Sequence, residues 1–368
     1  MGLLRAVPIL GVAVWRTLAG QQLPADSGRF RLTPLVAPAY SPEMRFLVAS
    51  GFLASWKNGA QWLELQRSTL SSVVSISTTG AVNAAATLTA FAAHDRFRIT
   101  ADLSYKNLPD NYWGVGFASG LQLAEGDSTT RYRRKWFKFN PEALCRVADH
   151  LFVGGAFEFA RTDASDVSPA MRADASYRSA GGLVRSVGLG LATEYDSRDV
   201  AINPWHGLYL GLSTMFYGPY LGGDHTYQTY LVDYRQYRPL GRPGRTLAWQ
   251  VKAQIGAHDV PWPELSLLGT GSDLRGYTEG RFRDRSTLLG VVEYRYTFLR
   301  RSGQLSRHGF VMWVGGGALG RDPAHLVGVL PNAGAGYRFE IQPRASVRLD
   351  AGVGRKSSGV YFSFGEAF

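Results

Sequence analysis

The chain has 368 residues, of which 45% are hydrophobic, 12% aromatic and only 19% charged, and its formal net charge is +11. This composition excludes an intrinsically disordered chain, and a mean hydropathy of -0.11 without a long apolar run excludes a polytopic helical membrane protein. The basic residues are spread along the whole chain, so we expect no nucleic-acid partner. A soluble all-β protein and a transmembrane β-barrel remain.

Residues 1–25 have the pattern of a secretory signal peptide. Arg5 precedes an apolar run from Ala6 to Trp15, and small residues follow as far as Ala25. The run is too short to cross a bilayer, and the alternative interpretation is a short buried helix. We therefore expect export, followed by a short periplasmic segment at 26–44.

From residue 45 onward, apolar and polar residues alternate in segments that predict strands. In the segment 96–105, for example, Phe97 and Ile99 share one face and Arg98 lies on the other. Alternation alone also fits a soluble sandwich, but segments of about 10–12 residues suit a tilted membrane crossing better. The expected strands are 45–56, 69–78, 82–92, 96–105, 113–123, 130–146, 151–161, 183–195, 207–217, 225–237, 246–257, 286–298, 308–318, 330–341, 344–354 and 359–368. We therefore predict an all-β fold, a 16-stranded antiparallel transmembrane β-barrel over residues 45–368.

The connections between these strands differ in length at the two ends of the barrel. Long connections at 162–182, 258–285 and 319–329 fall at one end, and short turns near Gly80, Asp149 and Gln342 fall at the other. Outer-membrane barrels place long loops outside the cell and short turns in the periplasm. The longest of these connections, 258–285, has a length that in compact domains is usually functional or disordered.

The sequence carries no recognisable catalytic motif. The histidines fall in or beside predicted connections, and no nucleophile elbow, zinc-protease motif or phosphate-binding loop is present. Cys145 is the single cysteine, which excludes a disulfide framework and a cysteine-rich metal site. We therefore expect no enzyme activity, no catalytic residue, no cofactor and no metal.

A first polar cluster lies between Tyr195 and Gly207. Aspartate, asparagine, proline and glycine are typical of ordered turns, so we expect a structured turn on the periplasmic side. Its key residues are Asp196, Arg198, Asp199, Pro204 and Gly207.

A second polar cluster lies inside the longest connection and contains Leu274, Arg275, Gly276 and Tyr277. Glu293 occupies the polar face of the strand that follows. Because a buried arginine needs a carboxylate partner, we expect Arg275 to anchor the loop in the lumen by pairing with Glu293. The alternative is a solvated surface loop.

The chain ends with aromatic residues, which is typical of barrels assembled into the outer membrane. We expect Phe362, Phe364 and Phe368 to form a C-terminal assembly signal on the last strand, where Glu366 interrupts the apolar face.

The turn cluster at Tyr195–Gly207, followed later in the chain by the loop cluster at Leu274–Tyr277, resembles the motifs of the outer-membrane assembly superfamily that includes BamA and TamA. This superfamily is also called the bacterial surface antigen family. That family has sixteen-stranded barrels whose longest loop folds into the lumen, with an Arg-Gly-Phe/Tyr tip like Arg275–Tyr277. The chain departs from it at Trp313, where the family usually has an aspartate as a second partner of the loop arginine. The interval 26–44 is also too short for a periplasmic POTRA domain, so the resemblance is to a barrel-only branch.

The resemblance implies an integral protein of the bacterial outer membrane that acts in insertion or translocation of polypeptides. Its partners would be outer-membrane lipids including lipopolysaccharide, unfolded outer-membrane proteins as clients, and accessory proteins.

Two other functions stay open. One is a passive or plugged channel with an anion-preferring lumen; the other is a scaffold barrel for a partner protein or lipid. The cations that would line the channel are Arg96, Arg98, Lys252, Arg344 and Arg348.

Overall fold

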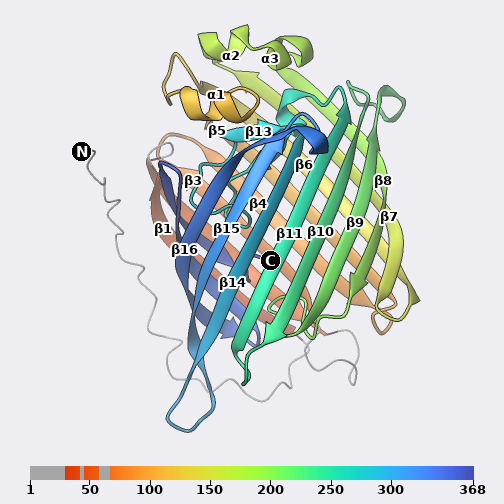
Figure 1. Ribbon diagram of the computed structural model, residues 1–368, viewed down its shortest axis with the longest axis vertical. Coiled ribbons are helices and arrows are strands. Elements are labelled where there is room, and N and C mark those ends of the chain that lie inside the picture. Colours follow the sequence, from red (N-terminus) through yellow and green to blue (C-terminus); the bar gives the residue numbers. More distant parts are fainter. Residues whose placement is uncertain (1–29, 42–44, 58–66) are drawn as a thin grey trace.

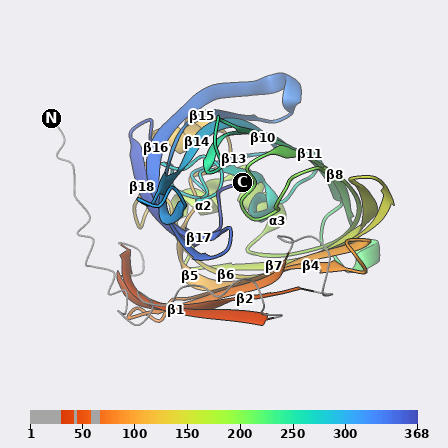
Figure 2. The same ribbon diagram turned by 90° about the horizontal axis from the view of Figure 1, so that it is seen from below.

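The structure is a computed structural model that describes residues 30–41, 45–57 and 67–368. Within these residues the chain forms an antiparallel sheet of sixteen strands. Each strand is hydrogen-bonded to the strands before and after it in the order given below. The strands lie tilted and side by side (Figure 1) and form a ring when viewed from below (Figure 2). They are β1 (Phe30–Ser41), β2 (Arg45–Trp56), β3 (Ser68–Ser77), β4 (Val82–Ala92), β5 (Phe97–Asn111), β6 (Arg131–Ala148), β7 (Leu151–Ser165), β8 (Leu183–Asp196), β9 (Gly207–Tyr217), β10 (Tyr227–Pro239), β11 (Arg245–His258), β14 (Ser286–Leu299), β15 (Leu305–Gly320), β16 (Leu326–Gln342), β17 (Ala345–Gly354) and β18 (Ser357–Phe364).

Shorter elements belong to the connections. The small strands β12 (Ser266–Leu268) and β13 (Phe282–Asp284) pair with each other inside the β11–β14 connection. Helices α1 (Phe117–Gln122), α2 (Pro169–Ala173) and α3 (Ala175–Ala180) lie over the upper end of the barrel in Figure 1. Single turns of 3₁₀ helix occur at Pro219–Leu221, Trp262–Glu264 and Pro323–His325.

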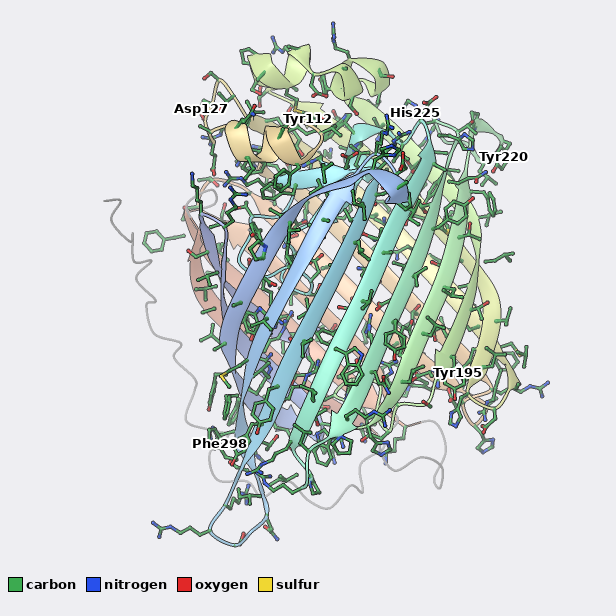
Figure 3. The ribbon with its side chains drawn as sticks, viewed as in Figure 1. Tyr112, Asp127, Tyr195, Tyr220, His225 and Phe298 are labelled. Atoms are coloured by element: carbon green, nitrogen blue, oxygen red, sulfur yellow. The ribbon has the colours of Figure 1, made fainter. Side chains whose placement is uncertain are left out.

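The two faces of the wall follow the alternation in the sequence. On β5, Phe97 and Ile99 are more than 40% exposed on the outer face, whereas Arg98 is only 7% exposed inside. Side chains of both faces line the tilted strands in Figure 3, where Tyr195 and Phe298 lie at the lower end. An apolar outer face and a charged inner face are the pattern of a barrel in lipid. The predicted sixteen-stranded antiparallel transmembrane β-barrel is confirmed.

No helix among the described residues is long and apolar enough to cross a membrane.

Two of the predicted elements are wrong, and the errors cancel in the strand count. The segment 113–123 is not a strand, since it contains α1 and the positive-φ glycines Gly114 and Gly116, and Phe117 packs against Phe282 of β13. The missing strand is β1, which lies within the segment 26–44 that we expected to precede the barrel. β1 contains Pro34 and Pro38. Proline is tolerated on edge strands because it has no N–H for a second neighbour.

The exchange of these two elements inverts the direction of the strands between them. The turn around Gly80 therefore lies at the same end as the long connections, not at the short-turn end as predicted. The turns around Asp149 and at Pro343–Arg344, beside Gln342, lie at the short-turn end. The predicted signal peptide at 1–25 lies outside the described residues.

The last predicted strand, 359–368, is also shorter in the structure. β18 ends at Phe364, and Gly365 turns the chain with φ of 73°. The last residues then enter the barrel, where the C-terminal mark lies inside the ring of strands (Figure 2). Phe368 is 7% exposed in the interior, so it does not continue the outer face of the last strand.

Candidate functional site

The β11–β14 connection occupies the lumen of the barrel. Its β12–β13 pair leads to a tip at which Leu274 and Arg275 have no exposed surface and Tyr277 is 2% exposed. Leu274 and Tyr277 belong to an apolar cluster with the barrel residues Leu289 and Val311. The tip is therefore packed against the wall, unlike a solvated surface loop.

Among the described residues, the side chain of Arg275 contacts three partners, each on a different strand. Its Nη2 donates to Glu293 Oε1 on β14, and its Nη1 donates to Asp350 Oδ2 on β17 at 2.7 Å. Its guanidinium carbon lies 3.6 Å from the ring centroid of Trp313 on β15. All four side chains are at most 3% exposed. The structure thus brings Arg275 and Glu293 together and adds a second carboxylate.

Asp350 is the centre of a larger charged cluster. Besides Arg275, it accepts from Arg338 Nη1 at 2.5 Å and from Arg348 Nη1 at 3.1 Å. Arg338 also donates to Glu366 at 2.7 Å, which connects the cluster to the C-terminal segment. Buried charges persist only when each is paired and hydrogen-bonded, so the cluster fixes the loop, β16, β17 and the chain end relative to one another.

Two glycines allow the loop backbone to touch the wall. Gly276 has φ of 114°, and a Cβ built on it would lie 2.7 Å from the carbonyl carbon of Val353. A Cβ on Gly352 of β17 would lie 2.8 Å from the carbonyl carbon of Arg275. A side chain at either position would push the loop and the strand apart.

Tyrosine hydroxyls connect the tip to the last strands. Tyr277 Oη donates to Pro331 O on β16 at 2.7 Å, and Tyr361 Oη on β18 donates to Tyr277 O at 3.0 Å. The Gly276 N–H in turn donates to Tyr361 Oη at 2.9 Å. The loop therefore contacts β14 to β18, the strands that approach the C-terminal edge of the sheet.

The turn between β8 and β9 makes ion pairs across the lower end of the lumen. Asp196 is 4% exposed and accepts from Arg198 Nε at 2.8 Å and from Arg98 Nη1 on β5 at 2.6 Å. Asp199 Oδ2 accepts from Arg344 Nη2, between β16 and β17, at 2.9 Å. The Arg344 guanidinium lies 3.6 Å from the Trp205 ring centroid. This turn therefore joins opposite parts of the wall.

Pro204 and Gly207 shape the same turn. Pro204 is buried. Gly207 has φ of 108°, and a Cβ there would lie 2.3 Å from Ser197 O, so only glycine fits where β9 begins.

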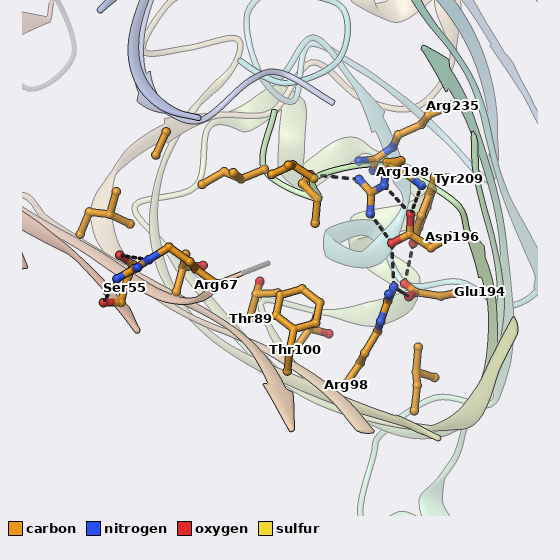
Figure 4. A pocket seen from close by; sticks show the side chains of 18 of the residues that line it. Ser55, Arg67, Thr89, Arg98, Thr100, Glu194, Asp196, Arg198, Tyr209 and Arg235 are labelled. Atoms are coloured by element: carbon orange, nitrogen blue, oxygen red, sulfur yellow. Dashed lines mark hydrogen bonds and ion pairs between the residues drawn. The ribbon is translucent and has the colours of Figure 1, made fainter. Parts of the chain in front are cut away.

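A cavity of about 270 Å³ lies among this turn, the strands β2 to β6 and β8 to β10, and the β16–β17 turn (Figure 4). Arg98, Glu194 and Asp196 line one side of it, and Ser55, Arg67 and Thr89 line another. Figure 4 shows Arg98 and Arg198 converging on Asp196. The lumen is thus occupied by the loop on one side and partly open here.

The first and last strands of the sheet form its two edges. In the described part of the chain, β1 pairs only with β2 and β18 only with β17. Both strands lie on the same side of the barrel in Figure 2. Inside the barrel, Gln342 Nε2 of β16 donates to Thr33 Oγ1 of β1 at 2.9 Å, and Gln342 Oε1 accepts from Ser55 Oγ of β2 at 2.6 Å. We call the boundary between β1 and β18 the seam.

The sequence motifs located the loop tip and the turn, but they missed several partners. Asp350, Arg98 and Arg344 were not expected as partners, although each lies on a polar strand face or in a predicted turn.

The C-terminal phenylalanines face different sides of the wall. Phe362 is 49% exposed on the outer face of β18, whereas Phe368 faces inward, and Arg295 Nη2 donates a hydrogen bond to its carbonyl oxygen at 2.8 Å. Phe364 is the last residue of β18 and is partly exposed.

Known proteins share this architecture. The sequence profile of the Omp85 superfamily domain matches residues 61–368, and no curated protein sequence matches the chain. BamA from Haemophilus ducreyi lacking POTRA domains 1–3 has a TM-score of 0.57 at 12% identity, over 92% of this chain and 69% of that one.

Two further solved structures are CdiB proteins. CdiB from Acinetobacter baumannii has a TM-score of 0.54 at 11% identity, and CdiB from Escherichia coli has 0.57 at 14%. Each similarity covers 92% of this chain, but only 59% and 62% of those chains. The chain thus spans about three fifths of the CdiB proteins.

Proposed function

Because the chain belongs to the Omp85 superfamily and is an integral outer-membrane β-barrel, we propose that it inserts or translocates other polypeptides at the outer membrane. Its substrates would be unfolded outer-membrane proteins. The observation that carries the proposal is the seam, where β1 and β18 have no strand pairing with each other among the described residues.

An unpaired strand edge is a template for a further strand. The free N–H and C=O groups of such an edge can pair with an extended segment of another chain. Here the edge strand β18 is short and is held from inside through Tyr361 and the loop tip, while β1 is held through Gln342. A client strand would add at the seam while these inner contacts hold the remaining wall.

The anion-preferring channel has less support from the same residues. Three of its five expected cations are neutralised by carboxylates: Arg98 by Asp196, Arg344 by Asp199 and Arg348 by Asp350. Paired arginines attract anions weakly, because the neighbouring carboxylate cancels much of the field.

Site-specific photo-crosslinking in cells that express a stalled β-barrel client tests the proposal. A photoreactive residue at Leu32, on the outer face of β1 and 57% exposed, should crosslink to the client. The matched control is Val251, which is 45% exposed on the outer face of β11, inside the continuous wall. Equal client crosslinking at Leu32 and Val251 would count against insertion at the seam.

A further inference from the structure

Five arginines gather at the lower end of the wall, around two neighbouring turns. One turn joins β10 to β11 and the other joins β14 to β15, and they are adjacent because β11 pairs with β14. No acidic residue occurs in residues 234–247 or 294–308. We call these residues the arginine rim: Arg238, Arg242, Arg245, Arg300 and Arg301.

The arginine rim differs from the arginines of the lumen. Arg98, Arg275 and Arg338 each form an ion pair with a carboxylate. Within the described residues, no ion pair joins a rim arginine to an acidic side chain, and all of the rim except half-buried Arg242 is exposed. Arg242 and Arg245 both lie against the ring of Tyr296, and two guanidinium groups so placed repel each other unless an external anion lies between them.

Contacts with a lipid-facing aromatic ring place two residues of the rim, Arg242 and Arg245, at the depth of the membrane surface. The guanidinium carbons of Arg242 and Arg245 lie 4.9 and 5.3 Å from the ring centroid of Tyr296, on the outer face of β14. That ring stacks on Phe310 at 5.1 Å and contacts Phe298 at 5.4 Å, and Figure 3 shows Phe298 beside the β14–β15 turn. Such aromatic clusters mark the interface between hydrocarbon and headgroups.

Arg242 is also held in place before any ligand binds. Its Nη2 donates to Thr297 O at 3.0 Å and its Nη1 to Pro243 O at 2.8 Å. Guanidinium groups bind phosphate oxygens through two parallel hydrogen bonds, and basic residues beside a membrane surface attract anionic lipids.

We propose that the arginine rim binds the headgroups of anionic phospholipids in the periplasmic leaflet. The headgroup phosphates lie among the guanidinium groups, and the upper acyl chains pack against Tyr296, Phe298 and Phe310. The rim lies on strands β10 to β15, away from the seam, so the proposal stands apart from the insertion of clients.

Lipid titration of the full chain in mild detergent, read by native mass spectrometry, tests the proposal. The probes are phosphatidylglycerol, phosphatidylcholine with the same acyl chains, and inorganic phosphate. We expect the wild type to bind phosphatidylglycerol at least about tenfold more tightly than phosphatidylcholine, and inorganic phosphate not to displace it. Equal binding of the two lipids, or displacement by inorganic phosphate, would overturn the proposal.

Variants assign the binding to the rim. R238Q/R245Q/R300Q/R301Q should bind phosphatidylglycerol at least about tenfold more weakly, and R300Q/R301Q, confined to an exposed turn, about fivefold more weakly. The matched control removes four exposed arginines elsewhere, R161Q/R172Q/R178Q/R355Q, and should bind as the wild type does. The assignment would be overturned by unchanged lipid binding of R300Q/R301Q or by an equal loss of lipid binding in the control.

Discussion

Arg275 and Asp350 are 75 residues apart in the chain, yet they form a 2.7 Å hydrogen-bonded ion pair in which neither side chain has exposed surface. Asp350 lies on β17, whereas Glu293, the expected partner of Arg275, lies on β14. The loop tip is thus held between two parts of the wall. Trp313 lies between them and contacts Arg275 with its ring face.

Truncation of either carboxylate should strongly destabilise the folded barrel. We expect Asp350→Ala and Glu293→Ala each to lower the free energy of unfolding by about 3–5 kcal/mol, because among the described residues Asp350 is the only carboxylate paired with buried Arg348 and Glu293 the only one paired with buried Arg295. Denaturant titration in lipid vesicles measures this. The control is Glu279→Ala in the same loop, whose exposed pair with Lys106 should contribute less than about 1 kcal/mol.

The same residues allow a direct test of coupling. The double variant Arg275→Ala/Asp350→Ala should cost at least about 1 kcal/mol less than the sum of the two single variants, because each single variant already breaks the ion pair that joins these two residues. Additive costs would show that Arg275 and Asp350 do not interact energetically.

Glycine at the loop tip should be as important as the charges. We expect Gly276→Ala to destabilise the barrel by about 2–4 kcal/mol and to raise pore conductance, since its φ is positive and its Cβ would meet the β17 backbone. Gly290→Ala is the control, because the nearest atom to its Cβ would be 4.0 Å away. Planar-bilayer recording and denaturant titration measure both effects, and equal conductance of the two variants would contradict the close packing.

Phe362 and Phe368 should have different roles, one in membrane insertion of the chain and the other in stability of the folded barrel. Phe362 faces outward and Phe368 packs near Tyr237 inside the barrel. We expect Phe362→Ala to slow membrane insertion of this chain, and Phe368→Ala to leave that rate unchanged while lowering stability by about 3 kcal/mol. Slower membrane insertion of the Phe368→Ala variant would contradict this prediction and show that Phe368 is part of the assembly signal.

Sequence periodicity predicts the faces of the barrel wall but not every element of it. Alternation predicts the outer and inner faces of strands such as β5 and β14, since a period of two places every second residue toward lipid. It failed at β1, where two prolines weaken the strand pattern, and at 113–123, where apolar residues pack against the folded-in loop. Local pattern does not report that packing.

The candidate site was predictable only in part for a similar reason. The Leu274–Tyr277 motif and Glu293 are close in sequence and share a recognisable spacing. Asp350, Arg98 and Arg344 meet their partners only when the wall curves into a ring, and a single sequence contains no signal for that pairing. The inward turn at Gly365 likewise depends on Arg338 and Arg295, which receive the chain end.

The inner bridge at Gln342 should restrain the seam. We expect Gln342→Leu to increase client crosslinking at Leu32, because it removes the hydrogen bonds to Thr33 and Ser55 that join β16 to β1 and β2. Gln304→Leu, in the exposed β14–β15 turn, is the control. Equal crosslinking in both variants would show that Gln342 does not restrain the seam.

A disulfide lock of the seam tests the proposed mechanism most directly. The double variant Leu32→Cys/Phe362→Cys joins outward-facing positions on β1 and β18, and Val360 and Phe364 are alternative partners for the cysteine on β1. The control is Trp249→Cys/Val292→Cys, which locks two paired positions of β11 and β14 inside the continuous wall. Client insertion into vesicles is measured before and after reduction. We expect the disulfide across the seam to abolish client insertion, the control disulfide to leave it unchanged, and reduction of the seam disulfide to restore it. Client insertion at the wild-type rate with the seam fully locked would contradict opening between β1 and β18.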